Sequence, residues 1–387
     1  MSAHSKKSQW RLWVLTALVV ATGSIGFFRW AKSTDIGAGD FNAYWSASRL
    51  FLQGRNPCDR ENLLEMERSH SNPDQDYAVM VWNPPTLWVF LLPVSWMPLQ
   101  TARAVWLLIN VTLLLLSCLI LHRVYFPTRG IIPFVVYCLM VLVFAPVLIA
   151  MIAGQVTFLV LFGLAVSLLL VKRGQFFWGG AMLILTTPKP HLVVLTVPYL
   201  MLYMVIHRKW SGWLGLAASG AVCAAILSAL RPNWIMDFSL IFSNPPTEWV
   251  TPTLGGMMKR YGMGSWGQWV GLVSLLLLPV FLRQPEILPI ESVVGLLTLI
   301  TVPITFFGWS YDQSILLIPI AQIVFWLSDP SSLRVAQWGL GGLIASVLVC
   351  NIVQRTAARS EAEYFWVPLA WAGIYALSWW FGNRNDD

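Results

Sequence analysis

Charged side chains are scarce in this sequence. Only 11% of the 387 residues are Asp, Glu, Lys or Arg, whereas about 25% is usual for a soluble protein. Hydrophobic residues make up 57% of the chain, and apolar runs of about 20 residues, the length that crosses a bilayer, recur from one end to the other. A single water-exposed globule is therefore excluded, and the sequence predicts an all-α integral membrane protein with many spans.

Cysteine is also scarce, and the motifs of several common sites are missing. Four of the five cysteines lie in apolar runs and only Cys58 lies in a polar loop, so no intrachain disulfide is expected. The chain has no GxxxxGK[ST], HExxH or GxSxG motif and no GxGxxG motif after a predicted strand, and a nucleotide substrate is not expected. His70, Asp74 and Asp76 form the one candidate metal pattern, which is too weak to predict a metal site, and no cofactor is expected.

Residues 84–97 decide the predicted topology. Trp10 to Trp30 predicts a first transmembrane helix that starts in the cytoplasm. The apolar piece 84–97 holds about 14 residues, which can barely span a hydrocarbon core of about 30 Å. If it spans, the basic pairs at 123/129, 172/173 and 208/209 all fall outside; if it lies at the interface or re-enters, they all fall inside. The positive-inside rule favours the second arrangement.

That arrangement predicts about twelve spans with both termini in the cytoplasm. Two large loops then lie outside, at residues 31–100 and 231–264, together with most of the eighteen acidic residues. We therefore expect one polytopic domain, 1–387, in the plasma membrane, with its polar site on the extracytoplasmic face. After the first helix, the predicted spans are 101–122, 131–151, 155–171, 176–188, 191–206, 211–230, 265–282, 287–306, 312–328, 333–353 and 362–381.

The first outer loop contains a candidate amphipathic helix that begins near Asp40 and lies on the outer membrane surface. Its apolar residues fall near one helical face, and Gly54 is a typical C-terminal stop. Two interpretations of Asp40 remain open. It caps the helix by accepting the first backbone N–H groups, or it is a carboxylate held at the bilayer surface, where an amphiphilic and a hydrophilic substrate can meet.

Three further polar clusters map to the same outer side. Gln155 lies in a Gly-Gln turn between two helices, which alone indicates no more than a turn. Lys189, bracketed by prolines, cannot continue a helix; it is an interfacial snorkelling lysine or a point charge placed for a phosphate at headgroup level. His191 shares that role or anchors the interface. Asp312, in Trp-Ser-Tyr-Asp-Gln at the mouth of a helix, is a helix cap or a second candidate carboxylate.

The order of these features resembles the GT-C superfamily of membrane glycosyltransferases, and more narrowly glycosyltransferase family 87. In that superfamily an outward acidic residue after the first helix precedes a surface helix and a short x-Pro-Pro helix. The resemblance implies a GT-C-like helical bundle that uses polyprenyl-phosphate mannose to make α-mannosides. Cys58 and Asn83 stand where the family commonly has Tyr. The matching residues, within about 40–190, are Asp40-Phe-x-x-Tyr44, Arg49, Gly54-x-Asn56-Pro57, Asn83-Pro84-Pro85, Gly154-Gln155 and Lys189-Pro190.

One carboxylate and nearby cations are enough for the reaction that the resemblance implies. Polyprenyl phosphate already leaves well, whereas the acceptor hydroxyl has a high pKa and needs a base. A single displacement with inversion needs one carboxylate, whereas retaining glycosidase chemistry uses two. We expect Asp40 to be the base, with Asp35 and Asp312 as alternatives, and Lys189, alone or with His191, to hold the phosphate. The candidates for contacts to the sugar or headgroup are Tyr44, Asn83 and Gln155.

The expected partners are the lipid bilayer, a polyprenyl-phosphate sugar donor and a glycan or glycolipid acceptor, without nucleic acid or nucleotide. A transporter or flippase for a lipid-linked sugar or another solute is the alternative, and a non-catalytic scaffold is a third possibility. Transporters often have inverted repeats and broken helices near the midplane, but this sequence shows no paired halves. Release of polyprenyl phosphate with formation of a glycoside would identify an enzyme, whereas solute flux without either would identify a carrier.

Overall fold

The computed structural model describes residues 32–34, 36–126, 130–243, 246, 248–264, 266–282, 288–329, 334–357 and 360–382. Every regular element within these residues is a helix, which confirms the all-α prediction. The expected first span, Trp10 to Trp30, and the alternative base Asp35 lie outside the described residues.

The helices follow one another through turns and loops, with a longer connection at residues 71–85. The first half of the chain forms α2 (Gly39–Leu52), α3 (Arg60–His70), α4 (Thr86–Ser95), α5 (Leu99–Tyr125), α6 (Ile131–Val143), α7 (Ala145–Ala153), α8 (Thr157–Lys172), α9 (Phe176–Met182), η1 (Leu183–Thr186), η2 (Pro190–Val193) and α10 (Thr196–Ile206). The second half forms α11 (Ser211–Leu230), α12 (Trp234–Ser239), η3 (Leu240–Ser243), α13 (Leu254–Arg260), η4 (Trp266–Trp269), α14 (Val270–Val273), η5 (Ser274–Leu277), α15 (Leu278–Leu282), α16 (Ile290–Ile304), η6 (Ser310–Leu316), α17 (Leu317–Leu327), α18 (Arg334–Ala357), η7 (Glu361–Phe365) and α19 (Trp366–Gly382).

The described residues hold four helices long and apolar enough to cross a membrane, or five when α6 and α7, bent by 54°, count as one span. Other predicted spans are short or broken helices. The spans expected at 176–188 and 191–206 become α9 with η1 and η2 with α10, because Pro188 and Pro190 interrupt helical hydrogen bonding. The count of about twelve spans therefore stays a prediction.

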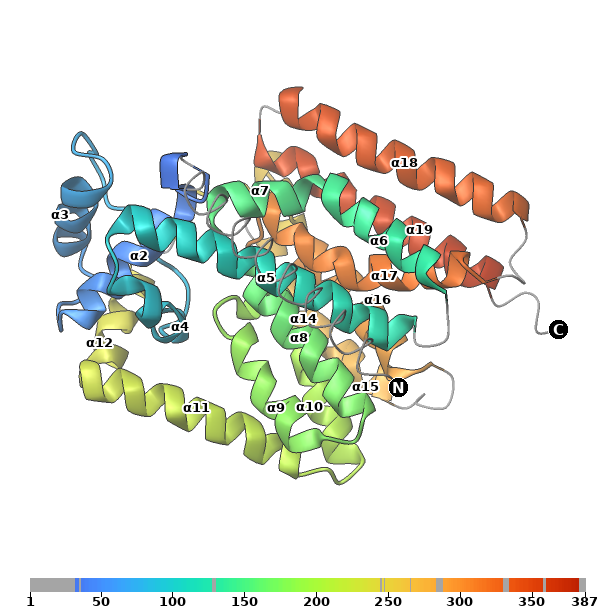
Figure 1. Ribbon diagram of the computed structural model, residues 1–387, viewed down its shortest axis with the longest axis horizontal. Coiled ribbons are helices and arrows are strands. Elements are labelled where there is room, and N and C mark those ends of the chain that lie inside the picture. Colours follow the sequence, from blue (N-terminus) through green and yellow to red (C-terminus); the bar gives the residue numbers. More distant parts are fainter. Residues whose placement is uncertain are drawn as a thin grey trace, which may run out of the picture.

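The long helices run along the long axis of the molecule, and α11 and α18 lie on opposite outer sides of the bundle (Figure 1). Both carry apolar side chains on their outer surface: Leu214 and Val222 of α11 are 64% and 60% exposed, and Val349 of α18 is 58% exposed. Exposed apolar surface of this kind is stable in contact with lipid. The outer helices thus fit the membrane protein that the composition predicts.

Helices α2, α3, α4 and α12 gather at one end of the bundle (Figure 1). Helix α4 has ten residues and is about 15 Å long at 1.5 Å per residue, too short to cross a membrane. Helix α5 runs from this end to the opposite one, where Lys172 Nζ donates to Val124 O (3.2 Å) and pairs with Glu291 (2.5 Å). The basic residues at the ends of α5 and α8 therefore lie far from α4, and the side of the membrane on which they lie stays a prediction.

Helix α2 differs from the expected surface helix, because it is buried on most of its faces. Ser46 and Ser48 are fully buried together with the apolar residues. At the other turns, Arg49 Nη1 donates to Ser95 O (2.7 Å) and Trp45 Nε1 donates to Met97 O (3.2 Å). Small side chains on the apparently polar face let neighbouring helices approach, so burial continues around the helix. Gly54, with φ +69°, ends α2 as predicted.

The buried carboxyl group of Glu67 fixes the loop between α3 and α4. Glu67 is 2% exposed; its Oε2 accepts hydrogen bonds from Gln75 Nε2 (2.5 Å) and from the backbone N–H of Val79 (3.1 Å). Burial raises the pKa of Glu67 to about 7. The folded protein therefore favours the protonated form of Glu67. The contribution of this group to the free energy of unfolding is fully present below the ordinary pKa of a glutamate and is lost as the pH rises through about 7.

We expect the melting temperature to fall by several degrees between about pH 5.5 and about pH 8.5, and Glu67→Gln, which cannot ionise, to remove most of that fall. Thermal unfolding in detergent at the two pH values measures the effect. Glu65→Gln is the matched control, since Glu65 lies on the same helix with its side chain 68% exposed. An equal fall in the wild type and in Glu67→Gln would show that this carboxyl does not titrate with unfolding.

Candidate active site

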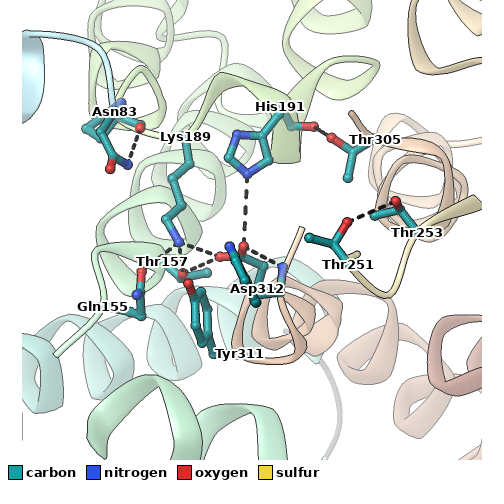
Figure 2. A network of polar contacts seen from close by, with 12 residues as sticks. Asn83, Gln155, Thr157, Lys189, His191, Thr251, Thr253, Thr305, Tyr311 and Asp312 are labelled. Atoms are coloured by element: carbon teal, nitrogen blue, oxygen red, sulfur yellow. Dashed lines mark hydrogen bonds and ion pairs between the residues drawn. The ribbon is translucent and has the colours of Figure 1, made fainter. Parts of the chain in front are cut away.

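Four segments that are distant in the sequence meet at the end of the bundle near α2. Helix α2 brings Asp40, the turn after α7 brings Gln155, the segment between η1 and η2 brings Lys189, and η6 brings Asp312. Figure 2 shows that Gln155, Lys189, Tyr311 and Asp312 point toward one another. The four polar clusters that the sequence suggested separately thus form one site.

Gly154 explains why Gln155 reaches α2. Its φ of +67° lies in the left-handed region that favours glycine, and it ends α7. A Cβ here would lie 2.6 Å from Gly37 O and 2.7 Å from Phe41 Cβ. Trp106 Nε1 donates to Gly154 O (2.8 Å) and its ring stacks on Phe41. The turn is therefore clamped against α2, with Gln155 beside Asp40.

Asp40 does not cap its helix, so that interpretation was wrong. Helix α2 has Ala38 at its N-cap and no side-chain capping bond. Instead, Asp40 Oδ2 accepts hydrogen bonds from Gln155 Nε2 and from the Tyr311 hydroxyl (3.0 Å). Burial raises the pKa of Asp40, while the positive charge of Lys189 opposes the shift. A carboxylate with a raised pKa is a stronger base for a hydroxyl proton.

Lys189 is buried in the protein rather than snorkelling to the interface. The residue is 3% exposed, and its ammonium donates to Asp312 Oδ1 (2.5 Å), Gln155 Oε1 (2.7 Å) and Thr157 Oγ1 (3.3 Å). The flanking prolines end the local helix, so that the side chain projects from an irregular turn. Lys189 therefore places a buried positive charge at the centre of the site.

Asp312 is both a cap and an ion-pair partner. Its Oδ2 accepts the backbone N–H of Trp309 (3.0 Å) and lies 4.0 Å from His191 Nε2, while Oδ1 accepts from Lys189 and from Thr157 (3.0 Å). The capping interpretation is thus correct but incomplete. Both oxygens have partners, which makes Asp312 a poorer candidate base than Asp40, whose Oδ1 has no hydrogen bond to any residue that the structure describes.

The remaining predicted residues lie around this cluster. The Tyr44 hydroxyl donates to Gln155 Oε1 (3.1 Å), and burial raises the pKa of Tyr44 well above its ordinary value, so the hydroxyl stays a donor. Asn83 Nδ2 donates to Pro188 O (2.9 Å), which ties the start of the α4 segment to the Lys189 turn (Figure 2). His191 is partly exposed, and Thr305 Oγ1 holds its backbone carbonyl (2.8 Å).

A cavity of about 440 Å³ joins this cluster to an apolar wall. Its polar lining includes Asp40, Tyr44, Asn83, Lys189, His191 and Asp312. Its aromatic lining includes Trp82, Phe238, Phe242, Trp249, Phe306 and Phe307. The cavity therefore offers polar contacts to a charged, hydroxylated group and apolar contacts to a hydrocarbon chain.

Sequence reasoning missed two kinds of site residue. Tyr311 contacts Asp40, and Thr157 contacts Lys189. In the sequence these two residues stand next to Asp312 and close to Gln155, which are the stronger candidates by residue type. The aromatic residues of α12 and of the loop after α16 gave no signal, since aromatics are common throughout this chain. Within the described ranges, no group of three or more His, Cys, Asp or Glu side chains could hold a metal ion.

The fold and the cavity define a helical membrane protein with a polar site next to an apolar wall. The family model for glycosyltransferase family 87 matches residues 82–314, more than half of the chain. The chain therefore belongs to glycosyltransferase family 87 and is a membrane glycosyltransferase of the GT-C type. No curated protein and no solved structure was found to match it.

The family match helps to separate the candidate functions and reaches further than the sequence motifs did. It identifies a glycosyltransferase, which favours the enzyme over the transporter and the scaffold. It extends to residue 314 and so includes Asp312 as well as Asn83, Gln155, Lys189 and His191, whereas Asp40 and Tyr44 precede it. The role of Asp40 therefore depends on the site geometry.

Proposed function

We propose that this enzyme transfers a hexose, with mannose as the first candidate, from a polyprenyl-phosphate sugar to a lipid-linked or envelope glycan acceptor. The cavity carries the proposal, because it sets a carboxylate and cations beside an aromatic wall. A donor with a sugar, a phosphate and a polyprenyl chain needs these two environments next to each other. The proposed location is the plasma membrane, with the site on the extracytoplasmic face and both termini in the cytoplasm.

The proposed reaction is a single displacement. The Asp40 carboxylate takes the proton of the acceptor hydroxyl as its oxygen attacks C1 of the sugar. The bond between C1 and the phosphate oxygen breaks, its electron pair stays on the phosphate, and polyprenyl phosphate leaves without a general acid. Attack from the face opposite the leaving group inverts C1.

Positive charge on one side of the cavity supports the departing phosphate. Lys189 and His191 are two residues apart on the same turn, and both line the cavity. The Lys189 ammonium is engaged by three acceptors, whereas the His191 side chain is 27% exposed. We assign the direct contact with the phosphate to the His191 side chain. Tyr44 and Asn83, which line the cavity, are proposed to contact the sugar or headgroup, whereas Gln155, the third candidate, is fully buried behind Asp40.

An assay with purified enzyme tests the proposal. Polyprenyl-phosphate mannose, glucose and arabinose are each offered with candidate lipid acceptors, and released polyprenyl phosphate and new glycoside are measured together. We expect equal amounts of both products from one preferred donor, with the anomeric configuration inverted in the glycoside. Retention of configuration, or no release from any of these donors, would contradict the proposal.

His191→Gln should raise the donor KM by about 10–100-fold, since a hydrogen bond to a charged group contributes about 1.5–3 kcal/mol. Initial rates at varied polyprenyl-phosphate sugar measure it. His207→Gln is the matched control, because His207 is exposed and follows α10, a whole helix away from the site. A donor KM equal to that of the wild type would remove His191 from the phosphate site.

A further inference from the structure

The hydrogen bonds of Lys189 leave no room for a direct contact to a substrate. An ammonium group has three hydrogens. Asp312 Oδ1, Gln155 Oε1 and Thr157 Oγ1 accept from Lys189 Nζ at 2.5, 2.7 and 3.3 Å, and the Tyr311 ring lies 4.8 Å from the same nitrogen. A phosphate oxygen could bind this nitrogen only by displacing one of these partners.

The same contacts decide which way the Gln155 side chain points. Gln155 is fully buried, and its Oε1 accepts from both Lys189 and the Tyr44 hydroxyl. Turning the amide over would place its NH2 group against the Lys189 ammonium, which can only donate, and its oxygen against Asp40 Oδ2, which accepts. Lys189 therefore holds the carboxamide with Nε2 toward Asp40.

The orientation of Gln155 in turn decides which oxygen of Asp40 is available. Gln155 Nε2 and the Tyr311 hydroxyl both donate to Oδ2, and Asp40 lines the cavity. Two donors on one oxygen favour the ionised carboxylate and fix its plane. The other oxygen, Oδ1, stays available to a hydroxyl in the cavity.

We propose that Lys189 is a positioning residue for the proton transfer. Asp312 holds Lys189, and Lys189 orients the Gln155 amide. Gln155 in turn holds Asp40 Oδ2, which leaves Oδ1 available to the acceptor hydroxyl. This inference rests on the proposed role of Asp40 as the base. The acceptor proton moves to Oδ1 while the acceptor oxygen bonds to C1 and the electron pair of the breaking bond leaves with the phosphate. Lys189 thus acts on turnover rather than on donor binding.

The charges around Asp40 give the proposal a signature in the pH profile. The titratable groups that face it are Tyr44 on its own helix, Lys189 on the turn, and Tyr311 and Asp312 on η6. Of these, Lys189 lowers the pKa of Asp40 and Asp312 raises it. A base works when deprotonated, so kcat falls as the pH falls through that pKa. Loss of the Lys189 charge should therefore move the acid limb to higher pH.

The test measures kcat, donor KM and the acid limb of kcat for Lys189→Met with polyprenyl-phosphate sugar as donor. We expect kcat to fall by about 10–100-fold, the cost of misplacing a catalytic group by about 1 Å, with donor KM within about threefold of the wild type and the acid limb at higher pH. A raised donor KM with the limb in place would make Lys189 a phosphate contact. A lower yield of active protein with an unmoved limb would make it structural. Either result overturns the proposal.

Gln155→Met keeps the proposal falsifiable if Lys189→Met folds poorly, since it leaves the pair between Lys189 and Asp312 intact. It should lower kcat and move the acid limb to higher pH, because the Gln155 hydrogen bond also lowers the pKa of Asp40. Wild-type kcat and an unmoved limb would overturn the proposal. Thr187→Val is the matched control: it removes hydrogen bonds of the same turn, to Thr86 and Ile184 O, without touching the cluster.

Asp40→Asn, assayed alongside, separates this inference from the function on which it rests. Wild-type turnover in Asp40→Asn would mean that the proposed base is wrong. An inactive Asp40→Asn, together with unchanged kcat and acid limb in Lys189→Met and Gln155→Met, would overturn the positioning role alone.

Discussion

Replacing Asp40 by Asn should lower turnover by at least about a hundredfold, since a general base contributes about 10²–10⁴-fold. The fold should survive, because an Asn side-chain oxygen can accept the same hydrogen bonds from Gln155 and Tyr311 that Asp40 Oδ2 accepts. The amide NH2 then takes the place of Oδ1 and cannot take a proton. Released polyprenyl phosphate per enzyme and the melting temperature in detergent measure the two effects.

Two further variants make this prediction sharper. Asp40→Glu should also be poor, since one more methylene displaces the carboxylate by about 1 Å, which can cost about 10²-fold. Asp59→Asn is the matched control: Asp59 caps α3 by accepting the backbone N–H of Asn62 (2.9 Å), and Asn is as good a cap. If Asp40→Asn kept more than about a tenth of the activity, Asp40 would not be the base, and Asp312 would be the next candidate.

Hydrophobic runs and charge scarcity were enough to predict the fold class and the positions of most described helices. Helix α11, predicted at 211–230, is Ser211–Leu230 in the structure, because a long, uninterrupted apolar run can only be buried or face lipid as a helix. The predicted spans failed as single helices where prolines stand close together, as at Pro188 and Pro190. Apolarity identifies a segment that belongs in the membrane region, but it does not determine whether the backbone crosses in one piece.

The candidate site was predictable as separate residues, but not as a network. Gln155 and Asp40 are 115 positions apart and Lys189 and Asp312 are 123 apart, and no local pattern records such contacts. The capping interpretation of Asp40 failed for a smaller reason: α2 begins at Gly39 with Ala38 at its N-cap, two positions before Asp40, and helix ends are uncertain by a residue or two in any sequence analysis. That shift turns a cap into a side chain that is free to join the cluster.

Breaking the pair between Lys189 and Asp312 from either side should destabilise the protein by about 3–5 kcal/mol, the usual cost of an unpaired buried charge. The two side chains are 4% and 2% exposed, so water cannot replace the lost partner. Lys189→Met leaves the Asp312 carboxylate without its cation, and Asp312→Asn leaves the ammonium without its anion. Thermal unfolding in detergent should show a clear loss of stability for each.

The double variant Lys189→Met with Asp312→Asn should recover most of that stability but not the turnover. It buries no charge at this position, and its Asn can accept the backbone N–H of Trp309 and donate to Thr157 Oγ1, the partners that Asp312 has now. Gln155 would still lack the ammonium that orients it toward Asp40, so turnover should stay about 10–100-fold below the wild type. Recovery of both properties would make the pair a structural feature only. Recovery of neither would mean that the cavity needs this ion pair to form, because stability and turnover then depend on the same two charges.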